Sequence, residues 1–382
     1  MARPPRPPAT CQPANPPPPR RVALIHDYLN QSGGAERVLE ELHALWPDAP
    51  IFTSIYDRER MPPAYRSWPI RTTFMQRLPG ILRNHQPYLP IYPIAFSRLD
   101  LRGYDLIISS SSAFAKNIHP PPGATHICYC HSPMRFAWNA ADYARRERLG
   151  PALRAALSPL LRGLQRWDAR GTARVDHLIA NSAIVAARIR RYYGRDSTVI
   201  HPPVHTDLPL ATDAPSEYYL VLTRLVPYKR LDIVVEAFNQ LGLPLRIVGV
   251  GRDRAALERL ARPNITFLGG VSDAEKARLY AHCRATIFPA EDDFGIAQVE
   301  AQAAGRPVIA YRAGGATETV RDHVTGVFFD TQTPAAVAAA VRRCAATTFD
   351  PPTIQAHART FDAALFRARL RAFVDEAVGA RR

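Results

Sequence analysis

The sequence contains very little lysine. Of its 49 basic residues only Lys116, Lys229 and Lys276 are lysines, and the other 46 are arginines spread along the chain. The formal net charge of +15 would suit nucleic acid, but no nucleic-acid-binding motif occurs. We therefore expect no nucleic-acid partner, and we interpret the excess charge as attraction to phosphates, an acidic ligand or an anionic lipid surface.

Cysteine is also scarce. The five cysteines are few and odd in number for a chain of 382 residues, which argues against a framework of disulfide bonds. Cys128 and Cys130 precede His131, but no second pair of cysteines or histidines stands at a spacing suited to a metal. Residues two apart in a β-strand share one face, so we interpret Cys128 and Cys130 as core residues of a strand.

Long apolar runs are absent as well. No run approaches the roughly 20 residues that a membrane-spanning helix needs. The first 19 residues contain nine prolines and no apolar stretch. This composition argues against a signal peptide and predicts a disordered, Pro-rich tail over residues 1–20. We expect a cytoplasmic protein, for which peripheral contact with the inner face of the membrane remains open.

What the chain does have is an alternation of short apolar strands and longer helical segments. Its length is comfortable for two domains, and 47% hydrophobic residues are enough for two cores. The alternation predicts an α/β fold of two Rossmann-like, doubly wound domains that face a central cleft. We expect an N-terminal domain over residues 21–205 and a C-terminal domain over residues 206–362. A last helix over residues 363–382 is expected to pack back on the N-terminal domain.

The strongest candidate site is a loop that follows a predicted strand at residues 285–288. The loop carries three acids, Glu291, Asp292 and Asp293, and a fourth acid, Glu300, lies in the helix that follows. A carboxylate offers two acceptor oxygens, so Asp292 and Glu300 are candidates to bind sugar hydroxyls. The alternative is a solvated acidic loop that caps a helix.

The same helix offers a second candidate function at its first turn. Phe294 and Gly295 precede it, and Ile296 and Ala297 are its first residues. The first N–H groups of a helix attract anions, and a glycine lets a phosphate approach them closely. We therefore expect this turn to hold a diphosphate.

At this point the sequence resembles a known family. Asp292 and Glu300 are separated by seven residues, and this pair resembles the hallmark acids of the retaining glycosyltransferases of family 4, which have the GT-B fold. The resemblance extends from about residue 22 to about residue 365 and implies a GT-B enzyme. The first acid of the family is usually Glu and here it is Asp, so Glu291 and Asp293 are alternatives for that position.

Two further motifs match the donor site of this family. Gly33 and Gly34 directly follow the first predicted strand and precede a helix that we expect to begin at Glu36. They resemble the glycine loop of the N-terminal domain, where a tight turn exposes N–H groups to phosphate or sugar. Arg224 and Lys229 resemble the cationic pair that holds the donor diphosphate, because Arg offers a planar fork and Lys a compact charge.

Other matches complete the expected cleft. The segment His-Ser-Pro-Met-Arg, which runs from His131 to Arg135, resembles a subgroup of bacterial polysaccharide mannosyltransferases. The resemblance places His131 against the transferred sugar and suggests that Arg135 meets the acceptor or a phosphate. Gly270 and Val271 match the loop that meets the base of the donor, and the glycine pair 314–315 is expected to reach the ribose or diphosphate.

The resemblance implies transfer of a hexose with retention of configuration. His131, Arg224, Lys229, Asp292 and Glu300 are the candidate catalytic residues. Fixed cations stabilise the charge on the leaving diphosphate, and no Asp-x-Asp motif stands at a suitable strand end, so we expect no metal ion and no cofactor.

The donor and acceptor follow from the subgroup alone. GDP-mannose is the first choice and a UDP-hexose the alternative, and the expected acceptor is a lipid-linked or other saccharide of cell-envelope or exopolysaccharide synthesis. The basic helices expected at Leu153–Arg174 and Tyr143–Leu149 suggest an anionic membrane surface as a partner. A nucleotide-sugar epimerase or hydrolase and a non-catalytic nucleotide-binding protein are the competing classes.

Overall fold

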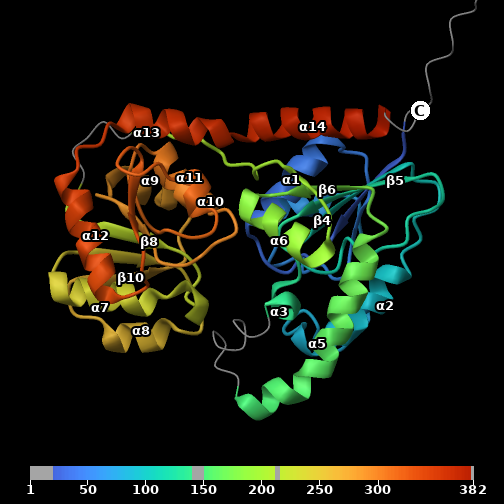
Figure 1. The fold of residues 1–382 in the computed structure, drawn as a ribbon, viewed down its shortest axis with the longest axis horizontal. Helices are drawn as coiled ribbons and strands as arrows, with labels where there is room; N and C mark the ends of the chain where they lie inside the picture. The colour runs from blue at the N-terminus through green and yellow to red at the C-terminus, as the bar shows by residue number, and fades with distance from the viewer. Residues whose placement is uncertain (1–19, 140–149, 211–215, 380–382) are drawn as a thin grey trace, which may run out of the picture.

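The computed structural model describes residues 20–139, 150–210 and 216–379 of the chain. Two α/β domains lie side by side along the long axis of the molecule (Figure 1). The expected tail over residues 1–20 lies outside the described residues except for Arg20, and the expected helix Tyr143–Leu149 lies wholly outside them.

The N-terminal domain is built on a seven-stranded sheet in the order β3-β2-β1-β4-β5-β6-β7, and its paired strands run parallel. The strands are β1 (Val22–His26), β2 (Ile51–Thr53), β3 (Ile70–Thr72), β4 (Leu106–Ser111), β5 (Thr125–Cys130), β6 (His177–Ala180) and β7 (Thr198–Val199). The α-helices are α1 (Gly34–Leu45), α2 (Tyr92–Ser97), α3 (Arg135–Trp138), α5 (Pro151–Thr172) and α6 (Ala183–Tyr193). Short 3₁₀ helices are η1 (Pro63–Ser67), η2 (Phe74–Arg77) and η3 (Gln86–Ile91).

The C-terminal domain repeats this plan with a six-stranded parallel sheet in the order β10-β9-β8-β11-β12-β13. Its strands are β8 (Tyr219–Leu222), β9 (Leu245–Val248), β10 (Ile265–Gly269), β11 (Thr286–Phe288), β12 (Val308–Tyr311) and β13 (Gly326–Phe329). Its helices are α7 (Leu231–Leu241), α8 (Arg254–Leu260), α9 (Asp273–His282), α10 (Ile296–Ala303), α11 (Ala316–Thr319), α12 (Pro334–Ala346) and α13 (Pro351–Ala358), with η4 (Pro227–Lys229) and η5 (Arg359–Phe361).

The fold class predicted from the sequence is confirmed. Both sheets are parallel, and both reverse their strand order beside the first strand, between β1 and β4 and between β8 and β11. In such sheets the crevice at the reversal point, at the carboxyl ends of the strands, is where ligands bind. One local expectation is wrong, because α1 begins at Gly34 rather than at Glu36. Gly34 therefore belongs to the first turn of the helix.

Local sequence signals explain where several helices begin and end. Ser182 and Ser272 each accept a hydrogen bond from a backbone N–H of the first turn of α6 and α9. Gly194 and Gly242 end α6 and α7 in the left-handed conformation, with φ of 64° and 68°. A glycine adopts this conformation without a steric penalty, so each stop is encoded locally.

The last helix, α14 (Ala363–Gly379), continues from α13 and lies along the N-terminal domain (Figure 1). Its apolar side chains, among them Phe366, Leu370 and Val374, belong to the hydrophobic core of the N-terminal domain. Arg367 adds an ion pair with Glu41 of α1. The helix therefore ties the end of the chain to the N-terminal domain.

Helix α5 extends away from the body of the N-terminal domain (Figure 1) and corresponds to the helix expected at Leu153–Arg174. Leu164 is buried on one side of it, whereas Arg162, Arg166 and Arg170 are exposed at intervals of four residues. Residues four apart share one face of a helix, so the three guanidinium groups form a stripe. Among the described residues, no helix is long and apolar enough to cross a membrane.

Candidate functional site

The predicted site residues gather at the carboxyl ends of strands beside the two reversal points. In the C-terminal domain, Arg224 and Lys229 follow β8, and Asp292 follows the neighbouring strand β11. In the N-terminal domain, Gly33 follows β1 and His131 directly follows β5. Because parallel strands end at a common edge, residues distant in sequence meet there.

The acidic loop is held in place by a glycine pair from the next loop of the sheet. The N–H of Gly315 donates to the carbonyl of Asp292 at 2.8 Å. A Cβ atom on Gly314 would lie 2.2 Å from that carbonyl oxygen, and one on Gly315 would lie 2.2 Å from Cα of Phe294. Only glycine permits this approach, so the pair supports the loop by backbone packing.

Asp292 faces the cationic loop of its own domain. Its Oδ1 atom lies 2.5 Å from Nζ of Lys229, and both side chains are largely buried. Arg224 is exposed, and its Nη2 atom donates to the hydroxyl of Tyr228 at 2.7 Å. Arg224 has no carboxylate partner within the described part of the chain. Its charge is therefore available to an anion beside the Lys229–Asp292 pair.

Glu300 is buried in the second turn of α10 among several donors. Its Oε1 atom accepts from Arg37 at 2.6 Å and from Lys276 at 3.3 Å, and its Oε2 atom accepts from the hydroxyl of Tyr280 at 3.2 Å. Lys276 also lies 3.0 Å from the exposed Asp273. Burial opposes the charge of Arg37, but Glu300 more than compensates and raises the pKa of that guanidinium. Burial, reinforced by Glu300, raises the pKa of Tyr280 well above its ordinary value.

The other two acids of the loop face the N-terminal domain. Arg188 of α6 pairs with Asp293 and lies 2.7 Å from Glu291, and Arg135 of α3 also pairs with Asp293. Burial works to raise the pKa of Asp293, but Arg135 and Arg188 outweigh it and the pKa is lowered. Of the three acids, only Asp292 pairs with a cation of the C-terminal domain within the described part of the chain. Arg135, expected at the acceptor or a phosphate, is here engaged in an ion pair between the domains.

The glycine loop touches the first turn of α10 across the gap between the domains. A Cβ atom on Gly34 would lie 2.8 Å from Cδ1 of Ile296. Gly33 precedes the helix α1, and a Cβ there would lie 3.2 Å from a carboxylate oxygen of Glu36. Gly295 begins α10 with φ of 92°, which favours glycine, and the first N–H groups of α10 belong to Ile296 and Ala297. The two predicted phosphate-binding turns therefore lie against each other.

His131 lies at the end of β5 and is 8% exposed. Its Nε2 atom lies 2.8 Å from the hydroxyl oxygen of Ser110. Burial and the neighbouring His26 lower the pKa of His131 to about 3, although Asp293 acts in the opposite direction. The imidazole is therefore neutral at physiological pH, and the charge of Asp293 in the acidic loop acts on it.

Some predicted residues lie farther from this centre. Gly270 and Val271 follow β10, which is the edge strand and is separated from β8 by β9. Gly270 is exposed, whereas Val271 packs partly against a core cluster of the C-terminal domain. Gly270 and Val271 thus lie at the carboxyl ends of the strands, as Arg224 does, but two strands away from it.

The sequence analysis did not predict several residues of the site. Arg37, Arg188, Lys276 and Tyr280 all contact an acid of the site. Lys276 carried a usable signal, because the chain has only three lysines. Two of them meet the two acids separated by seven residues. Cys128 and Cys130 are fully buried, and among the described residues no group of three or more His, Cys, Asp or Glu side chains is arranged to hold a metal ion.

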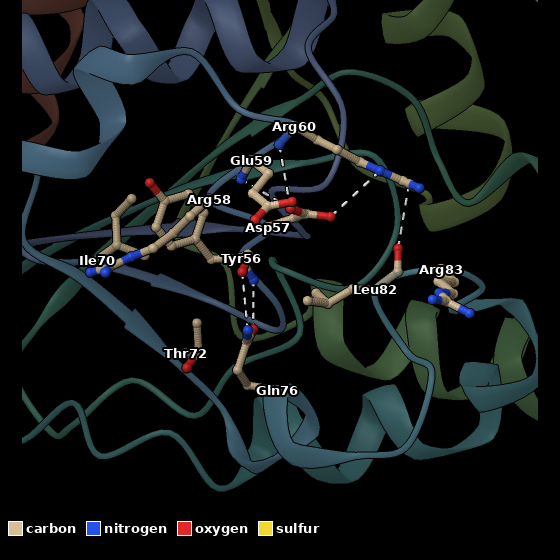
Figure 2. Close-up of a pocket in the computed structure, with 10 residues that line it drawn as sticks. All are labelled: Tyr56, Asp57, Arg58, Glu59, Arg60, Ile70, Thr72, Gln76, Leu82 and Arg83. Atoms are coloured by element: carbon tan, nitrogen blue, oxygen red, sulfur yellow. Dashed lines mark hydrogen bonds and ion pairs between the residues drawn. The ribbon is translucent and has the colours of Figure 1, made fainter.

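A pocket lies on the N-terminal domain. It has a volume of about 690 Å³ and lies beside β3 and residues 56–60, which follow β2. Figure 2 shows its lining residues, Tyr56, Asp57, Arg58, Glu59, Arg60, Ile70, Thr72, Gln76, Leu82 and Arg83. Gln76 is fixed by two hydrogen bonds with the backbone of Tyr56, which pairs with Leu29 beyond β1. The pocket therefore adjoins the edge of the sheet that carries His26.

Two family models match adjoining parts of the chain. The model described as Glycosyltransferase Family 4 matches residues 32–208, and the model described as Glycosyl transferases group 1 matches residues 209–348. Their boundary falls between the two sheets, and together they contain all the site residues named above.

Individual relatives match over shorter stretches. The D-inositol 3-phosphate glycosyltransferase of Segniliparus rotundus is 28% identical over 202 residues, which covers 45% of this chain and 45% of that protein. The GDP-mannose-dependent alpha-(1-6)-phosphatidylinositol monomannoside mannosyltransferase of Mycobacterium tuberculosis is 36% identical over 138 residues, which covers 31% of this chain and 36% of that protein. The chain thus spans less than half the length of these curated relatives.

Solved structures match over nearly the whole chain. The crystal structure of Anabaena Alr3699/HepE in complex with UDP and glucose has a TM-score of 0.69 and 19% sequence identity. The match covers 93% of this chain and 99% of that chain. At this identity the likeness concerns the fold, and it includes both domains.

Proposed function

Because the chain belongs to glycosyltransferase family 4, with the GT-B fold, we propose that it transfers a hexose from a nucleoside-diphosphate sugar to an acceptor hydroxyl with retention of configuration. One observation carries this proposal. The loop with Arg224 and Lys229 and the loop that leads into α10 meet at the carboxyl ends of adjacent strands, where Lys229 lies 2.5 Å from Asp292. A diphosphate placed there contacts two cations and the start of a helix.

The proposed chemistry uses these groups to stabilise the leaving diphosphate. As the bond between the anomeric carbon and the diphosphate breaks, negative charge develops on the leaving oxygen. Arg224 and Lys229 are fixed cations, and Ile296 and Ala297 provide helix N–H groups, so the charge is stabilised with little reorganisation. Since these residues supply the positive charge, we propose a metal-independent reaction. An undiminished rate in the presence of EDTA supports this, and a loss restored by Mg²⁺ contradicts it.

The acceptor oxygen then attacks from the face that the diphosphate leaves. Its proton passes to the leaving diphosphate oxygen, so no carboxylate is required as a nucleophile. Domain closure positions donor and acceptor and excludes the water that would otherwise hydrolyse the donor. The ion pairs between Arg37 and Glu300 and between Arg188 and Asp293 join the two domains around this region.

For the donor we propose GDP-mannose, with a UDP-hexose as the alternative. The support is the segment His131–Arg135 and the partial identity to a relative whose name specifies GDP-mannose. A ligand that binds the folded state raises the melting temperature, so a thermal-shift screen of nucleotide sugars tests the choice. A shift with GDP-mannose and GDP alone agrees with it, and a shift confined to uridine nucleotides contradicts it.

We propose that part of the acceptor, a lipid-linked or other saccharide, occupies the pocket shown in Figure 2. The pocket lies beside the same sheet edge as His26 and is lined by Arg58 and Arg83, which have no acid partner among the described residues. Substitution of either arginine by Ala is expected to raise KM for the acceptor and to leave KM for the donor unchanged. An equal rise in both values would place the acceptor elsewhere.

We also propose that α5 contacts an anionic membrane surface. Arg162, Arg166 and Arg170 form an exposed stripe on a helix that extends from the domain (Figure 1). Arginines near an anionic surface each contribute about 1 kcal/mol of attraction. Replacing all three by Gln is expected to abolish salt-sensitive sedimentation with anionic vesicles, while neutral vesicles serve as the control. Failure of the unmodified protein to bind anionic vesicles removes the proposal.

The competing classes are separated by two assays. An epimerase or hydrolase converts the donor without any acceptor, so nucleoside diphosphate release that does not depend on acceptor favours it. A non-catalytic nucleotide-binding protein binds the donor but transfers no sugar to any acceptor. The proposed transferase requires both substrates and loses activity in Glu300→Ala.

A further inference from the structure

Four buried polar side chains form a continuous chain behind the predicted sugar site. Nε2 of His26 lies 3.4 Å from Oε1 of Glu36, Nδ1 of His26 lies 3.1 Å from the hydroxyl oxygen of Ser110, and that oxygen lies 2.8 Å from Nε2 of His131. All four residues are less than 9% exposed. They come from the first turn of α1 and from β1, β4 and the end of β5, which are neighbours in the sheet.

The chemistry of these groups sets a direction for the hydrogen bonds. The carboxylate of Glu36 only accepts, so Nε2 of His26 carries a proton and donates it. In the form of His26 that carries this one proton, Nδ1 is unprotonated and accepts from the hydroxyl of Ser110. With its proton used in this way, the Ser110 oxygen accepts from Nε2–H of His131. This leaves Nδ1 of His131 unprotonated.

The remaining nitrogen of His131 is available to a substrate. Among the described residues, Nδ1 of His131 makes no hydrogen bond. Burial and the nearby His26 lower the pKa of His131 to about 3, so the ring has a single proton at physiological pH. Arg135, four residues after His131, forms an ion pair with Asp293 of the opposite domain, so the segment that carries the ring borders the gap between the domains. An unprotonated ring nitrogen there accepts a hydrogen bond from a hydroxyl group.

We propose that Glu36, His26 and Ser110 are positioning residues that hold His131 in the tautomer protonated on Nε2, so that Nδ1 accepts a hydrogen bond from one hydroxyl of the transferred hexose. The identity of the ligand rests on the proposed function, whereas the tautomer rests on the hydrogen-bond chain alone. If His26 were protonated on both nitrogens, every hydrogen bond from Ser110 onward would reverse and Nδ1 of His131 would carry the proton.

Nitrogen NMR of the full-length protein labelled at histidine tests the tautomer without any assay of activity. Protonated and unprotonated ring nitrogens resonate far apart, and the signals of His131 are identified by their loss in His131→Asn. The expected spectrum has a protonated Nε2 and an unprotonated Nδ1 for His131. A protonated Nδ1 overturns the proposal, whether or not the protein transfers sugar.

The chain offers a matched pair of serine variants. Ser109 and Ser110 are adjacent on β4 and are both fully buried. Ser109 lies 2.9 Å from Nε2 of a different histidine, His126. Ser110→Ala is expected to give His131 a mixture of tautomers, and Ser109→Ala is expected to leave its signals in place. A single tautomer of His131 in Ser110→Ala shows that the hydrogen-bond chain does not set the tautomer.

Kinetics with modified donors test the role toward substrate. Ser110→Ala is expected to lower kcat/KM about tenfold, the cost typical of losing one oriented hydrogen bond, with the change mainly in kcat. A donor deoxygenated at the hydroxyl that meets Nδ1 should react equally with Ser110→Ala and with the unmodified protein. If kcat/KM of Ser110→Ala stays tenfold lower than that of the unmodified protein with every monodeoxy donor, His131 does not bind a donor hydroxyl in the proposed way. Absence of turnover with all donors instead contradicts the proposed function, while the NMR result stands.

Discussion

The two halves of the site are built from different chemistry. In the C-terminal domain the central groups are charged and paired within the domain, as Lys229 pairs with Asp292 and Lys276 with Glu300. In the N-terminal domain the predicted ligand groups at the same gap are two glycines and a neutral imidazole, His131, because the arginines of that domain pair with acids of the other domain. A leaving diphosphate gains charge and a sugar hydroxyl does not, so the difference matches the two ends of one donor.

The lysines and arginines of the site differ in the domain to which their acid partners belong. Both lysines of the site pair with acids of their own domain, whereas Arg37, Arg135 and Arg188 reach across the gap to acids of the other domain. Arg presents several donors in a fixed plane and bridges two carboxylates, as Arg188 does with Glu291 and Asp293. Arg37, Arg135 and Arg188 thus join the domains, whereas Lys229 and Arg224 are the cations that we assign to the donor diphosphate.

The largest expected effect concerns Lys229, the lysine that we assign to the donor diphosphate. Lys229→Ala removes a fixed cation from the leaving group and is expected to lower kcat/KM by roughly 10²–10³-fold. Lys276→Ala removes a cation that already shares Glu300 with Arg37 and should cost less. Steady-state kinetics with the preferred donor measure both. Equal losses would contradict the assignment of Lys229 to the diphosphate.

The next contrast separates two adjacent acids. Asp292→Asn removes a charge-assisted hydrogen bond within the ligand site, and a loss of roughly 10–100-fold in kcat/KM is expected. Asp293→Asn weakens contacts with Arg135 and Arg188, so it should alter domain closure, measured by small-angle scattering, with a smaller kinetic loss. A larger kinetic loss in Asp293→Asn would make Asp293 the functional acid of the loop.

A smaller effect is expected where the two halves touch. Gly34→Ala places a Cβ atom 2.8 Å from Cδ1 of Ile296, the flexible end of that side chain, so the loss of activity should be only a few-fold. Ile296→Val removes that methyl group and should restore activity in the double variant. If the double variant is no better than Gly34→Ala, close contact between the domains is not what the substitution disturbs.

The last effect concerns stability and pH and leaves the comparison of activities aside. The pKa of His131 is about 3 in the folded protein, against an ordinary value of 6.5. Between these values the unfolded chain binds a proton that the folded chain does not, so stability falls as pH decreases through this window. His131→Asn should reduce the slope of the free energy of unfolding against pH by up to about 1.4 kcal/mol per pH unit. Urea unfolding between about pH 7 and pH 4.5 measures the slopes, and equal slopes contradict the assignment.

Much of the fold could be predicted because its signals are local. Helix α9 begins after the cap Ser272, and α7 ends at Gly242, where the backbone has φ of 68°. The edge strand β3 could not be predicted in this way. It has only three residues, and only Ile70 is apolar, so hydrophobic alternation has too little length to show.

The candidate site likewise contains residues that could be predicted from local motifs and residues that could not. The turn at Gly295 and the cations Arg224 and Lys229 stand in short motifs that can be recognised in one pass along the chain. Arg37 and Arg188 stand in ordinary helical segments and contact acids more than 100 residues away. A helix pattern indicates which face is apolar, but it carries no information about which domain lies opposite.

By itself, the sequence determined that two parallel α/β units form, where their glycine turns lie and which acids are candidates, because propensity, capping and periodicity act within a few residues. Only the tertiary structure decided that Asp292 meets Lys229 while its neighbours Glu291 and Asp293 face the other domain. Adjacent side chains on a loop point in different directions, and those directions are set here by the packing of Gly314 and Gly315 against the loop backbone.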